Sequence, residues 1–129
     1  MTTTLATVTF LVRDYDEAIA WFTKSLGFSL VEDSPQGLGK RWVIVEPSSG
    51  KGARLLLAQA ASPEQASAIG KAAGGRVAFF LHTDNFEVEH ARMLAAGIHF
   101  REKPRNEAYG KVAVFDDLYG NGWDLIGPA

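Results

Sequence analysis

The feature that most restricts the fold of this chain is an internal repeat. Residues 11–32 and residues 81–102 align without a gap when the second segment is displaced by 70 positions. The matched positions include Leu11 with Leu81, Asp14 with Asp84, Glu17 with Glu87, Gly27 with Gly97, and Glu32 with Glu102. In each copy they mark a strand end, a helix N-cap with its capping partner, a glycine C-cap and the following strand. The repeat therefore predicts two copies of one supersecondary unit.

The elements around these markers give each unit the order βαβββ. In the first copy we expect strands at residues 6–12, 28–31, 41–46 and 53–58, a helix from 14 to 26, and a breaker-rich turn at 34–39. In the second copy we expect strands at 76–82 and 98–102, a helix from Asp84 or Asn85 to residue 96, a loop at 103–110, and a closing hairpin at 112–126. A short alanine-rich helix at residues 62–74, opened by Ser62 and Pro63, joins the copies.

Two modules of this kind are expected to share one domain. The chain has 129 residues, of which 47% are hydrophobic, and neither half would bury a comfortable core alone. A helix on one face of each half leaves the other faces free to meet, and strand twist makes joined sheets curl. We predict an α+β fold for residues 1–129, in which two tandem βαβββ modules, at about 5–60 and 76–128, form a cup-shaped mixed eight-stranded sheet, with the linker helix at about 62–74.

Composition excludes several classes of function. The net charge of −2 has no basic block behind it, so we expect no nucleic-acid partner and no membrane partner. Cysteine is absent, which removes disulfides, thiol nucleophiles and cysteine-type zinc sites. The opening Met-Thr-Thr-Thr lacks the pattern of a signal peptide, and no apolar run approaches a membrane span, so we expect a cytoplasmic protein.

The closing hairpin contains the candidate polar site. Its outgoing strand, Trp123-Asp124-Leu125-Ile126, is apolar except for Asp124. A carboxylate in a mostly buried strand is costly unless it meets a metal, a cation or several donors. The simpler alternative is an acid near a sheet end that reaches water or pairs with an arginine. Arg54, Arg76 and the hydroxyl of Thr7 are the expected donors.

The repeat and two sequence runs resemble those of the vicinal oxygen chelate superfamily. The runs are Val12-Arg13-Asp14-Tyr15-Asp16-Glu17-Ala18-Ile19-Ala20-Trp21-Phe22, followed by Leu26-Gly27-Phe28, and Asp117-Leu118-Tyr119-Gly120-Asn121-Gly122-Trp123-Asp124-Leu125. That superfamily includes glyoxalase I, bleomycin-resistance proteins, fosfomycin-modifying enzymes and extradiol dioxygenases. The resemblance covers roughly residues 5–128. It is specific for the fold and leaves the substrate open, because one fold carries many chemistries.

The resemblance also locates the metal-ligand positions of the family. Its metal enzymes take four ligands, usually His, Glu or Gln, from the first and last strands of each half. These positions fall on Thr7, Leu56, Ala78 (or Val77 if the repeat is threaded without a gap) and Asp124. Only Asp124 is a strong ligand, and one carboxylate does not hold a divalent ion against water. We therefore expect no metal cofactor of the usual kind, with a divalent metal as the less favoured alternative.

Several other side chains are candidates for a ligand cavity. His82 is expected on the same strand face as Ala78, near the rim of the cavity. Arg76 is expected on this face as well, where its guanidinium could bind an anionic ligand through two hydrogen bonds. Aromatic and cationic residues beside them match the usual lining of a small-molecule pocket, although they also match an ordinary core. The candidate ligand-binding set is Asp124, His82, Arg76, Phe80, Trp42, Arg54 and Tyr109.

Three functions remain open from the sequence. The first is a small-molecule-binding protein of the bleomycin-resistance type, in which most metal positions are lost. The second is a metal-dependent lyase or dioxygenase with an atypical site around Asp124 and His82. The third is a dimeric interaction module. We also expect a homodimer, because exposed strand edges must be paired or covered and family members commonly pair modules between chains.

Overall fold

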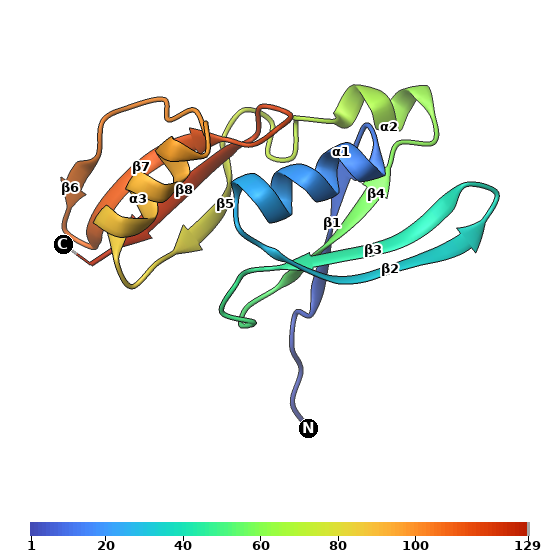
Figure 1. Cartoon of the computed structure of the whole chain (residues 1–129), viewed down its shortest axis with the longest axis horizontal. Helices are drawn as coiled ribbons and strands as arrows, with labels where there is room; N and C mark the ends of the chain where they lie inside the picture. Colours follow the sequence, from blue (N-terminus) through green and yellow to red (C-terminus); the bar gives the residue numbers. More distant parts are fainter. Residues whose placement is uncertain (129) are drawn as a thin grey trace. The chain divides into compact units, whose positions relative to one another are not determined.

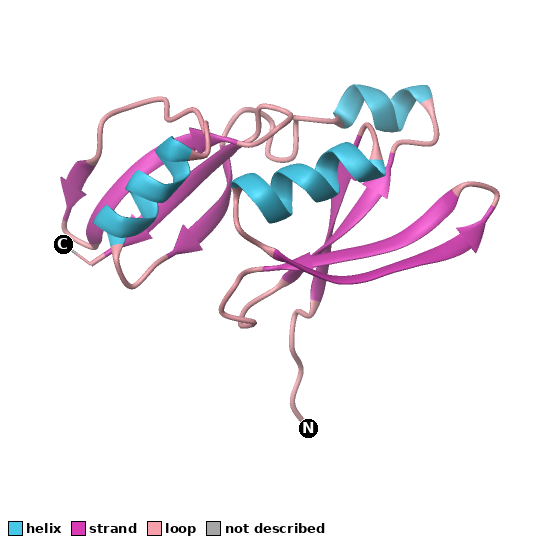
Figure 2. Ribbon diagram, in the orientation of Figure 1, coloured by secondary structure: helices cyan, strands magenta, loops and turns pink. Residues whose placement is uncertain are grey.

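The computed structural model describes residues 1–128, which divide into two compact units between Ile69 and Gly70. The first unit contains β1 (Thr7–Val12), α1 (Tyr15–Ala20), the π-helix η1 (Trp21–Ser25), β2 (Ser29–Gly37), β3 (Lys40–Glu46), β4 (Arg54–Gln59) and α2 (Pro63–Ala68). The second contains β5 (Val77–His82), α3 (Phe86–Ala95), β6 (Arg105–Glu107), β7 (Gly110–Asp116) and β8 (Gly122–Gly127). Figures 1 and 2 show these elements. The predicted α+β fold of two tandem βαβββ modules is confirmed.

The two units have the same sheet topology. The strand orders are β1-β4-β3-β2 and β5-β8-β7-β6, so the eight strands lie in two four-stranded sheets. In each sheet the first strand of the unit pairs in parallel with the last, and the remaining pairs are antiparallel. Each sheet is therefore mixed, and its last strand is central, between the first and third strands of its unit.

The first helix begins and ends where its sequence signals predict. The side chain of Asp14 accepts a hydrogen bond from the backbone N–H of Glu17 at 2.8 Å, which satisfies one of the free amides of the first turn. Tyr15, Ala18 and Phe22 form the buried face of the helix. The last turn widens into η1, where the N–H of Leu26 bonds to the carbonyl of Trp21. The chain leaves through Gly27, which has a φ of 85°.

Strand β2 is longer than the sequence suggests. A turn was expected over residues 34–39, but residues 34–37 continue the strand and pair with β3, and the turn is confined to Leu38 and Gly39. Pro35 is tolerated because β2 is an edge strand, so its missing N–H removes no bond from an inner ladder. A register shift between Pro35 and Gly37 accompanies it.

The linker helix is shorter than expected. Ser62 caps it as predicted, accepting from the N–H of Gln65 at 3.1 Å, but α2 ends at Ala68 instead of near residue 74. Gly70 has a φ of +79°, a backbone conformation that ends a helix. A Cβ at this position would lie 2.3 Å from the carbonyl oxygen of Tyr119, so only glycine fits here. Turns occupy the rest of the segment up to β5.

The second copy has one extra residue before its helix. Of the two N-caps considered for α3, the structure selects Asn85, whose Oδ1 accepts from the N–H of Val88 at 3.2 Å. The two helix caps are thus displaced by 71 positions, and not by the 70 of the ungapped alignment. A register shift between Val77 and Phe79 in β5 absorbs the extra residue.

The prediction of a strand at residues 98–102 is wrong. Only Phe100 makes an isolated bridge, to Phe115, and β6 forms instead at Arg105–Glu107, inside the expected loop. The segment still follows β7, because the N–H of Arg101 bonds to Val114 and the carbonyl of His99 accepts from Asp116. Pro104, which lacks an N–H, separates this bridge from β6.

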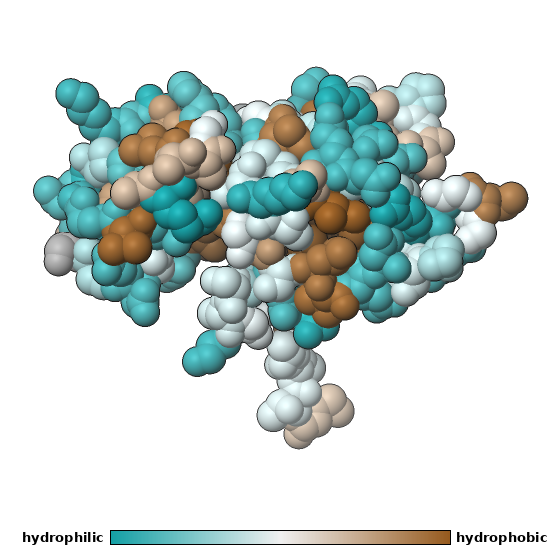
Figure 3. Space-filling view, viewed as in Figure 1, coloured by the Kyte–Doolittle hydropathy of each residue, from teal (hydrophilic) through white to brown (hydrophobic). Residues whose placement is uncertain are grey.

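Each unit buries one face of its sheet against its helix. The core of the first unit is built around Phe22, Val43, Val45 and Leu57, and that of the second around Met93, Phe115 and Leu125. On the face shown in Figure 3, apolar areas are separated by hydrophilic ones. Within residues 1–128, no helix is long and apolar enough to cross a membrane.

Candidate functional site

The sheet of the second unit has one face toward α3 and one face away from it. Lys111 pairs with Glu87 of α3, and Phe115 contacts Phe100, whose ring meets His90 of α3. The alternate residues of the strands must therefore point away from the helix. We call this second surface the distal face. Its residues are Phe80, His82, Val112, Val114, Asp124 and Ile126.

Asp124 is the buried polar group of the distal face. Its cross-strand neighbours are Phe80 on β5 and Val114 on β7. The residue is 7% exposed, and its Oδ1 atom has no hydrogen-bond partner among the described residues. Arg76, the expected donor in this unit, therefore does not bond to Oδ1. Buried polar atoms are rarely left unpaired, so this oxygen calls for an explanation.

The charges around Asp124 are engaged with one another. Arg105 donates from Nε to Glu102 at 3.1 Å and from Nη1 to Glu107 at 2.5 Å. Glu102 also accepts from the backbone N–H of Val114 at 3.2 Å. Burial raises the pKa of Asp124 above its ordinary value, Arg105 lowers it, and Glu102 raises it further. Arg105 thus acts on Asp124 through its charge, while its guanidinium bonds to other carboxylates.

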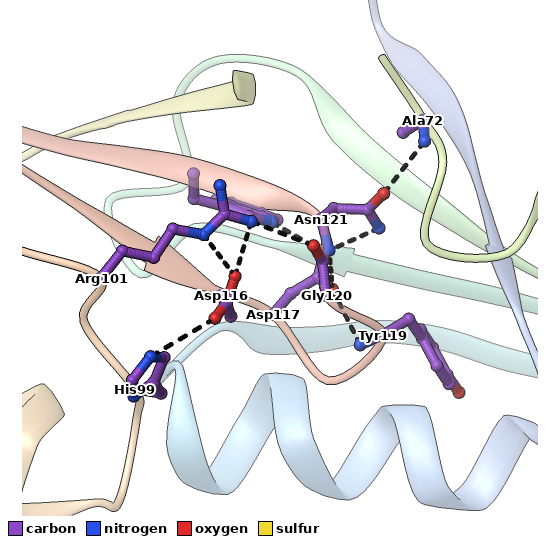
Figure 4. A network of polar contacts seen from close by, with 9 residues as sticks. Ala72, His99, Arg101, Asp116, Asp117, Tyr119, Gly120 and Asn121 are labelled. Atoms are coloured by element: carbon purple, nitrogen blue, oxygen red, sulfur yellow. Dashed lines mark hydrogen bonds and ion pairs between the residues drawn. The ribbon is translucent and has the colours of Figure 1, made fainter. Parts of the chain in front are cut away.

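Asp117 is a buried acid with a different role. Its Oδ1 accepts from the N–H groups of Tyr119, at 2.8 Å, and Asn121, at 3.1 Å. Its Oδ2 accepts from Nδ2 of Asn121 and Nε1 of Trp123, both at 2.9 Å. Asn121 in turn accepts from the N–H of Ala72, which ties the linker to the hairpin (Figure 4). A carboxylate with four donors holds a turn together and has little capacity left for a ligand.

The neighbouring acid, Asp116, belongs to an exposed ion pair. Arg101 donates from Nε to its Oδ1 at 2.7 Å and from Nη2 to the carbonyl of Gly120 at 3.2 Å (Figure 4). His99 lies 3.8 Å from the other carboxylate oxygen and is largely exposed. His90 packs between Phe86 and Phe100.

The structure places the predicted site residues in two groups. Phe80 and His82 lie with Asp124 on the distal face, and both are exposed. Tyr109 lies in the turn between β6 and β7 and is 62% exposed. Arg76 lies exposed just before β5. The sequence analysis did not identify Glu102 and Arg105 as neighbours of Asp124. Their three-residue spacing is compatible with an ion pair between them, but it does not place that pair next to Asp124.

Trp42 and Arg54 belong to the first unit. Trp42 is 40% exposed on β3, and Arg54 donates from Nε to Glu46 at 2.9 Å. The face of this sheet away from α1 also carries Thr7, which pairs in register with Arg54, and Leu56. Arg54 is thus a partner of an acid in its own sheet.

The donor set does not fit the family's metal site. Thr7 lies opposite Arg54 at the start of β4, and Val77 lies opposite Gly122 at the start of β8, so the place of Thr7 falls on Val77, directly before the register shift that contains Ala78. Val77 has no donor atom. Neither Leu56 nor Ala78 has a donor atom. No group of three or more His, Cys, Asp or Glu side chains that could hold a metal ion occurs within residues 1–128. Asp124 and His82 share a face, but no third ligand accompanies them.

Two βαβββ units, each with its last strand central in a mixed sheet, define the class of fold, and the last strand of the second unit carries the buried carboxyl group of the candidate site. The chain belongs to the Glyoxalase/Bleomycin resistance protein/Dioxygenase superfamily, whose family model matches residues 4–125. This confirms the resemblance seen in the sequence.

Several known proteins are similar to this chain over most of its length. An uncharacterized protein of Shewanella frigidimarina (strain NCIMB 400) is 50% identical over 120 residues, which cover 92% of this chain and 89% of that protein. The crystal structure of UcmS2 matches with a TM-score of 0.83 and 31% identity, covering 98% of both chains. TnmS3, an antibiotic binding protein from Streptomyces sp. CB03234, matches with a TM-score of 0.75 and 25% identity, covering 100% of this chain and 98% of that one.

Proposed function

We propose that this protein binds a small organic molecule on the distal face, without a metal ion. The observation that carries the proposal is a single buried, unpaired carboxyl oxygen on Asp124 beside the exposed ring of Phe80. Small-molecule sites combine apolar and aromatic walls with a few placed polar groups. Val114 and Ile126, both partly exposed, extend the apolar surface around the carboxyl group. The similarity to TnmS3 supports a binding role of this kind.

The loss of the metal site is part of the proposal. Leu56 and Ala78 provide no ligand atoms, and Thr7 provides only a neutral hydroxyl. A divalent ion needs several oxygen or nitrogen ligands that converge on one point. An atypical metal site at Asp124 and His82 would have to take its remaining ligands from water. A metal-free binding function does not require these additional ligands.

The test uses chelator-treated protein and an aromatic probe. We expect the purified protein to carry well under one equivalent of divalent metal, and its melting temperature to be unchanged by a chelator, because a bound metal would stabilise the fold by mass action. In the treated protein, 2-(methoxymethyl)naphthalene should shift the amide NMR signals of Phe80, Val114 and Asp124. Stoichiometric metal retained through dialysis, or probe binding that appears only after metal is added, would contradict the proposal.

We also propose that the protein is a homodimer. Each four-stranded sheet ends in two edge strands, β1 and β2 in the first unit and β5 and β6 in the second. Unpaired edges favour association with another chain. Sedimentation at micromolar concentration should give twice the 14.0 kDa mass of one chain. A single species with the mass of one chain would show that this prediction is wrong.

A further inference from the structure

The chemistry of the distal face restricts the class of ligand. Oδ1 of Asp124 is enclosed, and no donor within residues 1–128 reaches it. A carboxylate oxygen can only accept a hydrogen bond, so an ionised Asp124 needs a donor from outside the protein. The side chains that lie next to it across the sheet, Phe80 and Val114, have no polar atoms. The missing partner is therefore a hydrogen-bond donor.

The surrounding charges oppose an anionic ligand. The acids Glu102 and Glu107 occupy the guanidinium of Arg105, so this cation is already satisfied. With Asp124, the group contains three carboxyl groups and one arginine. An approaching carboxylate or phosphate would meet more negative than positive charge, and like charges at short range repel. Neutral donors and cations avoid this repulsion.

The neighbouring surface favours an aromatic frame. Phe80 is 62% exposed although it lies directly across from the buried Asp124. An exposed ring on a sheet face offers a flat surface against which another ring can stack. The partly exposed Val114 and Ile126 continue this surface without adding polar groups. A ligand that covers Phe80 can thus bring a substituent over Asp124.

We propose that the ligand of the distal face is an aromatic molecule bearing a hydrogen-bond donor, a hydroxyl or an ammonium group, which donates to Oδ1 of Asp124 while its ring packs on Phe80. This inference rests on the proposed binding function and names the ligand class of the same site. Asp124 is then the residue that sets specificity, and Phe80 supplies apolar contact.

The experiment compares four naphthalene probes by isothermal titration. Naphthalene-2-methanol and naphthalen-2-ylmethylamine carry donors, 2-(methoxymethyl)naphthalene lacks one, and naphthalene-2-carboxylate is an anion. We expect both donor probes to bind about tenfold more tightly than the ether, since one buried hydrogen bond to a charged group accounts for that ratio. The carboxylate should bind most weakly. The relative affinity of alcohol and amine then distinguishes a neutral donor from a cationic one.

The variant Asp124→Leu keeps a side chain of similar shape and removes the acceptor. In this variant the donor probes should lose their advantage over the ether, whereas the matched control Asp84→Leu, at an exposed acid outside the distal face, should retain that advantage. If all four probes fail to bind the native protein, both the proposed function and this inference are overturned. If ether and alcohol bind equally to the native protein, or the preference survives in Asp124→Leu, only the donor inference is overturned. The comparison of probes on the native protein holds even if the variant does not fold.

Discussion

Asp117→Ala is expected to lower the free energy of unfolding by about 3–5 kcal/mol, because it leaves buried donors without an acceptor. The native carboxylate accepts from Tyr119, twice from Asn121, and from Trp123, and it is 6% exposed. Loss of this acceptor removes the support of the turn and also weakens the contact between Asn121 and Ala72. Urea denaturation monitored by tryptophan fluorescence measures the change.

Asp116→Ala is the matched control for this prediction. The two acids are adjacent, but Asp116 pairs with Arg101, whose side chain is 41% exposed, and surface ion pairs contribute about 0–1 kcal/mol. We expect the control to lose less than about 1 kcal/mol. Equal effects for the two substitutions would show that the hydrogen bonds to Asp117 do not organise the hairpin.

The repeated order of elements could be predicted because its signals are local. Asp14 and Ser62 each cap a helix through an amide three residues away, so the sequence alone contains both partners. The errors arose where tertiary pairing decides. Pro35 remains in a strand because β2 is an edge strand, paired with β3 alone. The extra residue near Val77 is accommodated by a register shift between β5 and β8. Neither fact depends on residues close in sequence.

The candidate site was predictable in part for the same reason. Asp124 could be identified because a single acid interrupts an apolar strand. Its neighbours could not, because the path of the chain around Pro104 brings Glu102 and Arg105 beside β7. The partner of Arg54 in its own sheet, Glu46, lies across the β3–β4 turn and was not predicted either. Alternation along a strand gives the face of a residue, but the identity of its partners requires the register.

Asp124→Leu is expected to raise the free energy of unfolding by about 1–3 kcal/mol at neutral pH. The substitution removes a buried oxygen that has no hydrogen-bond partner and replaces it with apolar volume between Phe80 and Val114. The alternative role, a structural ion pair, makes the opposite prediction, because removing one partner of a buried pair costs about 3–5 kcal/mol. Denaturant unfolding of the variant distinguishes the two roles by the sign of the change.

The gain should depend on pH in a defined direction. The pKa of Asp124 is raised from 3.8 in the folded protein, chiefly by burial, so the folded state binds more protons than the unfolded state between the two pKa values. The contribution of Asp124 to the free energy of unfolding is therefore fully present below the pKa that the group has in the unfolded chain. It is lost as pH rises through the higher pKa that the group has in the folded protein. The leucine variant lacks this loss, and its advantage should grow from acid to neutral pH. If the stability advantage of the leucine variant instead shrinks as pH rises, the folded protein stabilises the ionised carboxylate, and Asp124 does not lack a hydrogen-bond donor. A gain in stability on removal of Asp124 would support the proposed binding role, because functional groups are often retained at a cost in stability.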